Sequence, residues 1–222
     1  MTTPPVSTLD SVYQTRFDER AREAKMEMWA EITRFLQKYV LDDEPLLDIA
    51  CDAGYFVRNV RASERWATDI RDVSDLLPPE VRFSRGDGLS LHETLPVGYF
   101  GTVFMSNYLE HLASPEAVIE QLRIARELLQ PRGRLIVLQP NIRLTGGSYW
   151  DFIDHRVALT ERSLVEAGEI VGLRVVKVIT RFLPFTTKSR LPQSTRLVRL
   201  YLSVPLAWRF LGQQSLYIAE PR

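Results

Sequence analysis

Apolar residues recur along the chain with two periods, and each period predicts a different kind of element. Residues 16–40 carry apolar side chains three and four positions apart, which predicts a long amphipathic helix. The apolar stripe of that helix consists of Met28, Ile32, Phe35, Leu36 and Tyr39. Short apolar runs of four or five residues then predict buried strands at 46–50, 65–69, 81–84, 101–105 and 135–139.

Helical patterns lie between several of these strands, and the clearest one covers residues 115–129. Ser114 is placed as its N-cap and Pro115 as its first residue, which suits the fixed backbone of proline. Pro131 and Gly133 follow where the helix is expected to stop. The buried stripe is Val118, Leu122, Ala125 and Leu129.

The second half of the chain continues the alternation of helices and strands. A helix capped by Thr160 is predicted to end near Gly172, and strands are predicted at 173–182 and 215–219. Strands that alternate with helices favour right-handed crossovers and a mainly parallel sheet covered on both faces. The pattern therefore predicts a doubly wound α/β fold.

No internal repeat and no Ser/Gly-rich linker divides the chain, so we expect one domain built around a single sheet. Residues 1–44 are expected to form an N-terminal helical cap, and 45–222 the main domain. Residues 184–212 are too long for a hairpin turn and too apolar to lie wholly in water, and they are expected to form a helical insertion.

Composition narrows the location and the class of partner. The only cysteine, Cys51, excludes a disulfide framework and a multi-cysteine zinc site, and no metal is expected. The sequence shows no targeting segment and no apolar run of about 20 residues, so we expect a cytoplasmic protein without a transmembrane span.

The 28 basic and 28 acidic residues cancel but are unevenly distributed. From Val171 onward nine residues are basic and one is acidic. This asymmetry could mark a phosphate-bearing or membrane-surface partner, or simply a solvated face. The basic end lacks the interleaved aromatic and basic residues of RNA-binding motifs, so no nucleic-acid partner is expected.

Three acidic residues lie in the last part of successive predicted strands or just after them. Asp48 lies in the first strand, Asp69 ends the second, and Asp87 follows the third. In an open α/β sheet ligands bind beyond the carboxyl ends of the strands, where these carboxylates could bind a ribose and an amine. Residues 47–56 predict a strand, a turn of small residues and the start of a helix, whose free N–H groups suit a carboxylate. Neither the dinucleotide fingerprint nor the phosphate-binding loop is present.

At these residues the sequence resembles the class I S-adenosylmethionine-dependent methyltransferases, including the methyltransferase type 11-like group. The resemblance extends from about Tyr13 to the end of the chain. Its most specific part is 104–112 with 131–135 behind it, and 47–54, 67–70 and 86–88 also carry it. It implies a seven-stranded sheet with an antiparallel final strand, and S-adenosylmethionine as the cofactor.

The resemblance also implies a role for each cofactor-binding residue. The loop after Asp48 would hold the methionine moiety, Asp69 with Ile70 the ribose, and Asp87 with Gly88 the adenine. Near the sulfonium would lie Ser106, Asn107 and Tyr108. Tyr13 and Arg16 could close over the cofactor, with Arg16 paired to its carboxylate, or could be a solvated helix face. The loop residues are Ala50, Asp52 and Gly54.

Two loop positions depart from the family pattern. The family usually has glycine where this chain has Ala50 and Asp52. Asp52 would bring a negative charge near the carboxylate of the cofactor, or would face its ammonium group. The departure keeps open a non-catalytic scaffold protein that retains the fold.

The downstream part resembles methyltransferases of glycan and polysaccharide biosynthesis. The resemblance rests on 139–143, 146–152, 154–155, 181–186 and 208–213. It implies O-methylation of a sugar, glycan or sugar-nucleotide hydroxyl. A small lipid or quinone-like metabolite is the alternative acceptor, favoured if the helical insertion forms a dry pocket.

Transfer of a methyl group to a hydroxyl requires a base, because the oxygen must lose its proton. His155, beside Asp154, is the first candidate, and His111 the second. Both histidines could instead have structural roles.

Arg143 could steer an anionic group of the acceptor, while Tyr149 and Trp150 could stack on a sugar or belong to the core. The insertion, with apolar residues at helical spacing and arginines nearby, could cap the acceptor pocket, form a homodimer surface or rest on a membrane.

Overall fold

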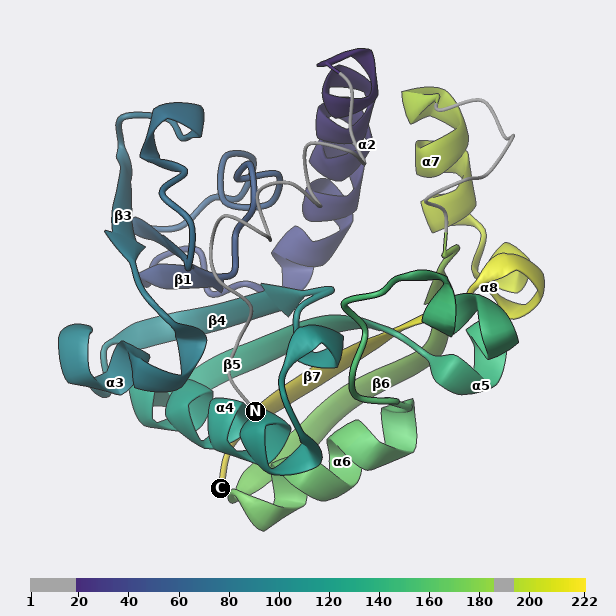
Figure 1. Cartoon of the computed structure of the whole chain (residues 1–222). Helices are drawn as coiled ribbons and strands as arrows, with labels where there is room; N and C mark the ends of the chain where they lie inside the picture. Colours follow the sequence, from purple (N-terminus) through teal and green to yellow (C-terminus); the bar gives the residue numbers. More distant parts are fainter. Residues whose placement is uncertain (1–18, 186–193) are drawn as a thin grey trace.

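The structure is a computed structural model that describes residues 19–185 and 194–222. Its strands form one seven-stranded sheet (Figure 1). They are β1 (Leu46–Ile49), β2 (Arg65–Asp69), β3 (Val81–Arg85), β4 (Phe100–Ser106), β5 (Leu129–Pro140), β6 (Leu173–Leu183) and β7 (Gln214–Pro221). Their spatial order is β3-β2-β1-β4-β5-β7-β6.

The strand order confirms the doubly wound α/β fold. β1 pairs in parallel with β2 on one side and with β4 on the other, so the strand order reverses beside β1. β7 runs antiparallel to both β5 and β6, as the family resemblance implies. A reversal of strand order opens a crevice at the carboxyl ends of the strands, where ligands bind in such folds.

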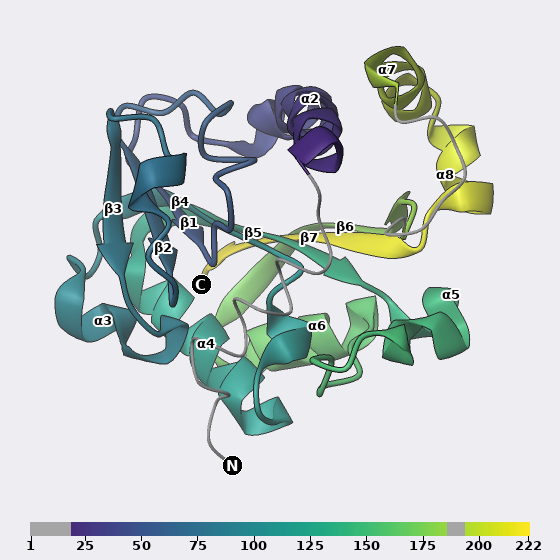
Figure 2. The same ribbon diagram turned by 45° about the horizontal axis from the view of Figure 1, so that its top comes forward.

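Helices cover both faces of the sheet (Figure 2). One face carries α3 (Leu91–Thr94), α4 (Pro115–Leu128) and α6 (Glu161–Ile170). The opposite face carries α2 (Glu19–Leu36), α7 (Thr195–Ser203) and α8 (Pro205–Leu211). Short helical turns complete the elements: η1 (Gln37–Tyr39), η2 (Ser74–Leu76), η3 (Gly88–Ser90), η4 (Leu109–His111), α5 (Ile142–Thr145) and η5 (Gly146–Asp151).

Each face of the sheet has its own apolar core. Leu122 and Leu164 pack with the inner residues of β4 and β5 on the α4–α6 side. Ile32 and Leu36 of the predicted N-terminal helix pack on the other side, together with Trp208 of α8. In the part of the chain that the structure describes, every helix is too short or too polar to cross a membrane.

The two predicted helix caps are confirmed. The side chain of Ser114 accepts a hydrogen bond from the backbone N–H of Ala117 at the start of α4. Thr160 forms a capping box with Ser163 at the start of α6. The helix predicted over 115–129 ends one residue earlier, at Leu128, and Pro131 and Gly133 lie within β5, which begins with the next residue.

The helix expected directly after β1 is absent from the described residues, so that prediction is wrong. Residues 52–59 form successive turns instead. The side-chain amide of Asn59 donates to the backbone carbonyl of Tyr55 at 2.9 Å, the acceptor that a helix would offer to the backbone N–H of Asn59. The backbone N–H of Asn59 donates instead to the carbonyl of Phe56, three residues earlier, which gives a tighter turn than an α-helix.

The described part of the insertion, residues 184–185 and 194–212, contains two helices separated at Pro205. Proline lacks the N–H that a continuous helix would need there, but it suits the first turn of α8. The hydroxyl of Tyr201 donates to Phe182 of β6, and the indole N–H of Trp208 donates to the carbonyl of Tyr201. The first bond attaches α7 to the sheet, and the second attaches α8 to α7.

Candidate functional site

A cavity of about 900 Å³ opens at the carboxyl ends of the central strands. Asp48, Asp69 and Asp87 all line it, together with residues of β4, α2, α7 and α8. The volume lies at the upper end of the range of about 300–1,000 Å³ that is usual for small-molecule sites. The three carboxylates that the sequence places on successive strands therefore share one cavity.

Asp48 is the most deeply buried of these acids, with 3% of its surface exposed. Burial raises the pKa of its carboxyl well above the ordinary value, and the nearby carboxylates of Asp69 and Asp52 raise it further. The backbone N–H of Val57 donates to the carboxyl and opposes this shift. Asp48 therefore fastens the loop after β1 to the strand.

The loop after β1 keeps a glycine-like backbone without the family's glycines. Ala50 has a φ of 58° and Asp52 a φ of 51°, both in the left-handed region. Such a conformation costs a residue with a side chain about 1–2 kcal/mol. Gly54 also has a positive φ, of 71°, and a Cβ there would collide with Leu77. Ala50 and Asp52 line the cavity, whereas Gly54 is not among its lining residues.

Asp69 is held by donors from two loops. Its carboxylate accepts the backbone N–H groups of Asp52 at 3.0 Å and of Arg71 at 2.9 Å. The guanidinium of Arg71 also donates to it at 3.1 Å and reaches Asp52 at 3.0 Å. Arg71 lines the cavity but was not predicted from the sequence. The sequence feature that could have indicated it is its position two residues after Asp69, the acid that ends β2.

Lys25 of α2 is a second cationic residue that sequence reasoning missed. Its ammonium lies 3.4 Å from the carboxylate of Asp52 and 4.2 Å from the ring centre of Tyr55. Burial lowers the pKa of Lys25, although Asp52 opposes the shift. The predicted carboxylate partner, Arg16, and the neighbouring Tyr13 lie outside the described residues.

The remaining predicted cofactor residues also line the cavity. Asn107 follows β4 with a φ of 48°, and its amide donates to Ser106 at 2.9 Å. Tyr108 donates to Gln121 at 2.8 Å and lies so close to Gly88 that a Cβ at that glycine would collide with the Tyr108 hydroxyl. Ile70 and Gly88 are lining residues as well.

The predicted base candidates cluster on the other side of the same cavity. Nδ1 of His111 lies 3.4 Å from the carboxylate of Asp154, and the rings of His111 and His155 are 5.0 Å apart. His155 stacks against Phe152 at 5.0 Å. Glu110 joins them with 1% exposure, and burial raises the pKa of its carboxyl. Glu110 was not among the predicted site residues.

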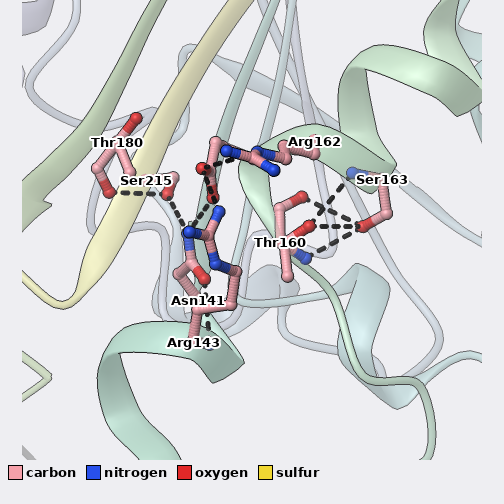
Figure 3. Close-up of polar contacts among 8 residues, drawn as sticks. Asn141, Arg143, Thr160, Arg162, Ser163, Thr180 and Ser215 are labelled. Carbon is pink, nitrogen blue, oxygen red and sulfur yellow. Dashed lines mark hydrogen bonds and ion pairs between the residues drawn. The ribbon is translucent and has the colours of Figure 1, made fainter.

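The predicted acceptor-binding residues do not line the cavity, so this part of the prediction is not supported. Arg143 pairs with Glu161 at 2.9 Å, and its backbone N–H donates to Asn141, in the network of Figure 3. Tyr149 is fully buried and donates to a backbone carbonyl, so neither ring face is open to a ligand. Trp150 is half-exposed but lies outside the lining.

Apolar side chains from distant segments form the rest of the lining. α2 contributes Met28, Trp29 and Ile32, and the chain around the end of β6 contributes Leu183 and Phe185. The helices of the insertion supply the outer wall. Their lining residues are Leu197, Val198, Leu200, Tyr201, Val204, Ala207 and Leu211.

A protein-family model described as a methyltransferase domain matches residues 17–178. This match covers well over half of the chain. Among the curated proteins, none matches the sequence.

Solved structures share the fold at low sequence identity. A methyltransferase from Archaeoglobus fulgidus, described as SAM-dependent, is 18% identical with a TM-score of 0.62, and the match covers 85% of this chain and 92% of that one. A possible histamine N-methyltransferase from Thermotoga maritima is 14% identical, with coverages of 96% and 99% and a TM-score of 0.68. A putative methyltransferase in complex with the Trm112 activator of Haloferax volcanii is 14% identical, with coverages of 92% and 94% and a TM-score of 0.65. At these identities the likeness shows the fold alone.

Proposed function

This chain belongs to the methyltransferase-domain family and is a class I S-adenosylmethionine-dependent methyltransferase, and from that premise we propose that it methylates a hydroxyl group of an acceptor with a large apolar part. The observation that carries the choice of acceptor is the apolar wall built by α2, α7 and α8 on the cavity that also holds the strand-tip acids.

The residues at the strand tips fit the cofactor by their chemistry. Asp69 offers a carboxylate to the ribose hydroxyls, and Asp87 and Gly88 suit the adenine. Lys25 supplies a cation to the carboxylate of the methionine part, and Asp52 an anion to its ammonium. Because Arg71 occupies lone pairs of Asp69, its guanidinium must shift when the ribose hydroxyls bind.

The apolar wall supports an acceptor that is largely hydrocarbon or aromatic. A polar sugar would lose hydrogen bonds to water against these side chains, at a cost that only polar partners could offset. The side chains expected to hold a sugar, Arg143, Tyr149 and Trp150, lie elsewhere. A glycan acceptor therefore stays a prediction without support from the lining of the cavity.

The chemistry assigned to the protein is positioning and removal of one proton. The bound cofactor supplies a methyl group on a sulfonium. As the acceptor oxygen forms its bond to the methyl carbon, the carbon–sulfur bond breaks and its electron pair stays on sulfur. The hydroxyl proton goes to a base, for which His155 with Asp154, and then His111, remain the candidates in the cavity.

Two measurements test the proposal in sequence. Isothermal titration should show S-adenosylmethionine binding to the purified chain, and no heat at millimolar ligand would reject the enzyme assignment for this chain. Methyl-tritiated cofactor is then supplied with either a total lipid extract or a mixture of sugar nucleotides and polysaccharide precursors. We expect label in the organic phase only. Label in the sugar fraction would establish the glycan acceptor, and binding without any transfer would favour the non-catalytic scaffold.

Two leucines of the insertion provide a matched pair of variants. Leu200 and Leu206 are each 61% exposed, but Leu200 lines the cavity and Leu206 does not. Leu200→Glu should lower transfer to an apolar acceptor about tenfold, because a carboxylate replaces apolar contact area. Leu206→Glu should leave the rate unchanged. Equal effects of the two substitutions would remove the apolar wall from the acceptor site.

A further inference from the structure

Glu110, His111 and His155 form a cluster of metal-ligating side chains on the acceptor side of the cavity. One ligand atom from each lies within 4.8 Å of the other two. Nε2 of His111 is 3.8 Å from Oε1 of Glu110. Ligands around a bound transition-metal ion are about 3–3.5 Å apart, given bonds of about 2.1 Å. Small side-chain rotations would therefore bring the three atoms to ligand distance.

Glu110 has a carboxylate oxygen that the protein leaves unused. Its Oε2 accepts a hydrogen bond from Gln139 at 3.1 Å. Its Oε1 is buried and has no hydrogen-bond partner among the residues that the structure describes. Burying an acceptor without a donor is unfavourable, so such an atom favours a bound ligand. Oε1 is the atom that faces His111.

His111 is oriented as a metal ligand would be. Its Nδ1 lies 3.1 Å from the backbone carbonyl of Asp154, which can only accept, so Nδ1 carries the proton. The lone pair is then on Nε2, toward Glu110. The carboxylate of Asp154 lies 3.4 Å from the same Nδ1. A histidine that donates its second N–H to a carbonyl or carboxylate is the usual arrangement at metal sites.

His155 is held in place by aromatic packing. Its ring stacks on Phe152 and meets Tyr149 edge-on at 4.8 Å. The fully buried Tyr149 is itself fixed by a hydrogen bond to the carbonyl of Val157, so its ring limits the movement of the His155 ring. Two constrained imidazoles and one carboxylate are a donor set that Zn²⁺, Mn²⁺ and Fe²⁺ favour, with coordination positions left for other ligands.

We propose that Glu110, His111 and His155 bind one divalent transition-metal ion in the wall of the cavity, with Asp154 positioning His111. The sequence alone predicts no metal, because its single cysteine excludes a multi-cysteine zinc site. That reasoning does not apply to a site built from histidines and a carboxylate. This proposal also gives His155 a different role from the predicted base, since a ring nitrogen that binds the ion is unavailable for the proton.

The role of the ion in catalysis rests on the proposed methyl transfer. An open coordination position next to the acceptor side suits the acceptor oxygen, and a bound cation favours loss of the hydroxyl proton. That proton passes to solvent or to the carboxylate of Asp154. The oxygen lone pair then forms the bond to the methyl carbon while the carbon–sulfur electron pair remains on sulfur. Metal binding itself does not depend on this step.

The test begins with metal binding to the full, tag-free chain without cofactor. After removal of metals with a chelator, Zn²⁺ is titrated calorimetrically, and Co²⁺ is added to record visible absorption from imidazole ligation. We expect one equivalent of each ion. His111→Gln and Glu110→Gln should each weaken binding at least about 100-fold, and Asp154→Asn about 10–100-fold.

His92 provides the matched control, because it is the remaining histidine and lies on α3, outside the cavity. His92→Gln should bind Zn²⁺ like the unsubstituted chain. Absence of stoichiometric binding, or equal binding by His92→Gln and His111→Gln, would overturn the proposal. Thermal unfolding of each variant shows whether it is folded. Because His111 and Glu110 are substituted separately, the test still holds if one of the two variants fails to fold.

Titration of the metal-free chain with S-adenosylmethionine separates this proposal from the proposed function. Cofactor binding without Zn²⁺ binding would reject the metal site alone. Zn²⁺ binding without cofactor binding would reject the proposed function alone. Where both bind, removal of the metal should lower methyl transfer while cofactor affinity stays within about twofold, and unchanged transfer would reject the catalytic role of the ion.

Discussion

The end of the cavity that we propose for the cofactor and the end that we propose for the acceptor are built from different kinds of residue. At the cofactor end, charged side chains from neighbouring strand tips and α2 hold one another, as Arg71 does with Asp69 and Asp52. At the acceptor end, aromatic and aliphatic side chains from α2, β6, α7 and α8 form the wall, with Glu110 and two histidines set into it. The first end is specified by strand tips that neighbour one another in the sheet, and the second by tertiary packing of distant segments.

The difference implies that the two ends can be damaged separately. Substitutions in the packing of α7 and α8 should lower stability or acceptor use while cofactor binding persists. Substitutions at the strand tips should remove cofactor binding while the fold persists. The following predictions test this separation.

The largest expected effect is on the packing that holds the acceptor wall. Trp208 is buried, and its ring lies edge-on to Phe35 at 5.5 Å and to Phe182 at 5.4 Å. Trp208→Ala should lower the free energy of unfolding by about 3–5 kcal/mol, measured by urea denaturation. Cofactor affinity in the absence of urea should be retained.

Trp150 is the control for that substitution, because it is half-exposed and does not line the cavity. Trp150→Ala should cost less than about 1 kcal/mol. An equal loss from both substitutions, or loss of cofactor binding in Trp208→Ala, would contradict the separation of the two ends.

At the cofactor end, Asp69→Ala should weaken S-adenosylmethionine binding at least about 100-fold in isothermal titration. The reason is the loss of hydrogen bonds from the ribose hydroxyls to a charged acceptor, each contributing about 1.5–3 kcal/mol. Asp72→Ala is the control, since that exposed carboxylate accepts hydrogen bonds from Ser74. If Asp72→Ala weakened binding as much, the ribose assignment of Asp69 would be wrong.

A smaller effect concerns the backbone of the loop after β1. The positive φ of Ala50 is strained, so Ala50→Gly should raise the free energy of unfolding by about 0.5–1 kcal/mol and the melting temperature by about 1–4 °C. Ala53, in the same loop, has no positive φ. Ala53→Gly should therefore lower stability, and stabilisation by both substitutions would show that backbone strain is not the cause.

The smallest effect is a pH dependence in the contact between α2 and α7. The carboxylate of Glu31 accepts two hydrogen bonds from Arg199, at 2.7 and 3.1 Å, which lowers the pKa of Glu31. A lowered pKa in the folded state adds stability above the unfolded pKa of about 4.3, and that stability is lost as the pH falls through the folded value. Because Arg199 is 65% exposed, the contribution should stay below about 1 kcal/mol.

Urea denaturation at several pH values measures this dependence. Glu31→Gln should be less stable than the unsubstituted chain at pH 7, and the difference should shrink as the pH falls from about 5 toward 3. Glu27, on the exposed side of α2, is the control, and Glu27→Gln should show no such convergence. If the difference in stability between Glu31→Gln and the unsubstituted chain grew on acidification, the pKa of Glu31 would be raised and not lowered by folding, which contradicts the prediction.

The fold and the position of the strand-tip acids around one cavity were predictable because their signals are local in the sequence. Five apolar runs and two capped helices identified most of the sheet and its layers, and acids at strand ends identified one rim of the cavity. The helix after β1 was predicted wrongly because the local bond from the side chain of Asn59 to Tyr55 competes with the helical backbone bond, which the apolar pattern does not report. The turn residues Ala50 and Asp52 nevertheless adopt the backbone that glycine would provide.

The sequence did not predict which side chains form the apolar wall of the cavity, because proximity there depends on how distant elements pack. Tyr149 and Trp150 look like ligand-stacking residues in the sequence, yet one is buried beneath His155 and the other lies away from the cavity. Arg143 forms an ion pair with Glu161, which lies 18 residues further along the chain. Glu110 lies in the segment 104–112 that carries the family resemblance, but the sequence assigned it no role.

The position of β7 between β5 and β6 has a consequence for the order in which the protein can fold during synthesis. β5 and β6 have no direct pairing, so they can belong to one sheet only when residues 214–221 lie between them. The α7–α8 wall lies between β6 and β7 in the sequence, so it can be anchored to the sheet at both of its ends only once β7 is in place. A nascent chain arrested before β7 would leave one edge of β5 unpaired and β6 without any strand partner, and such unpaired edges are the feature by which chaperones and other chains would recognise it.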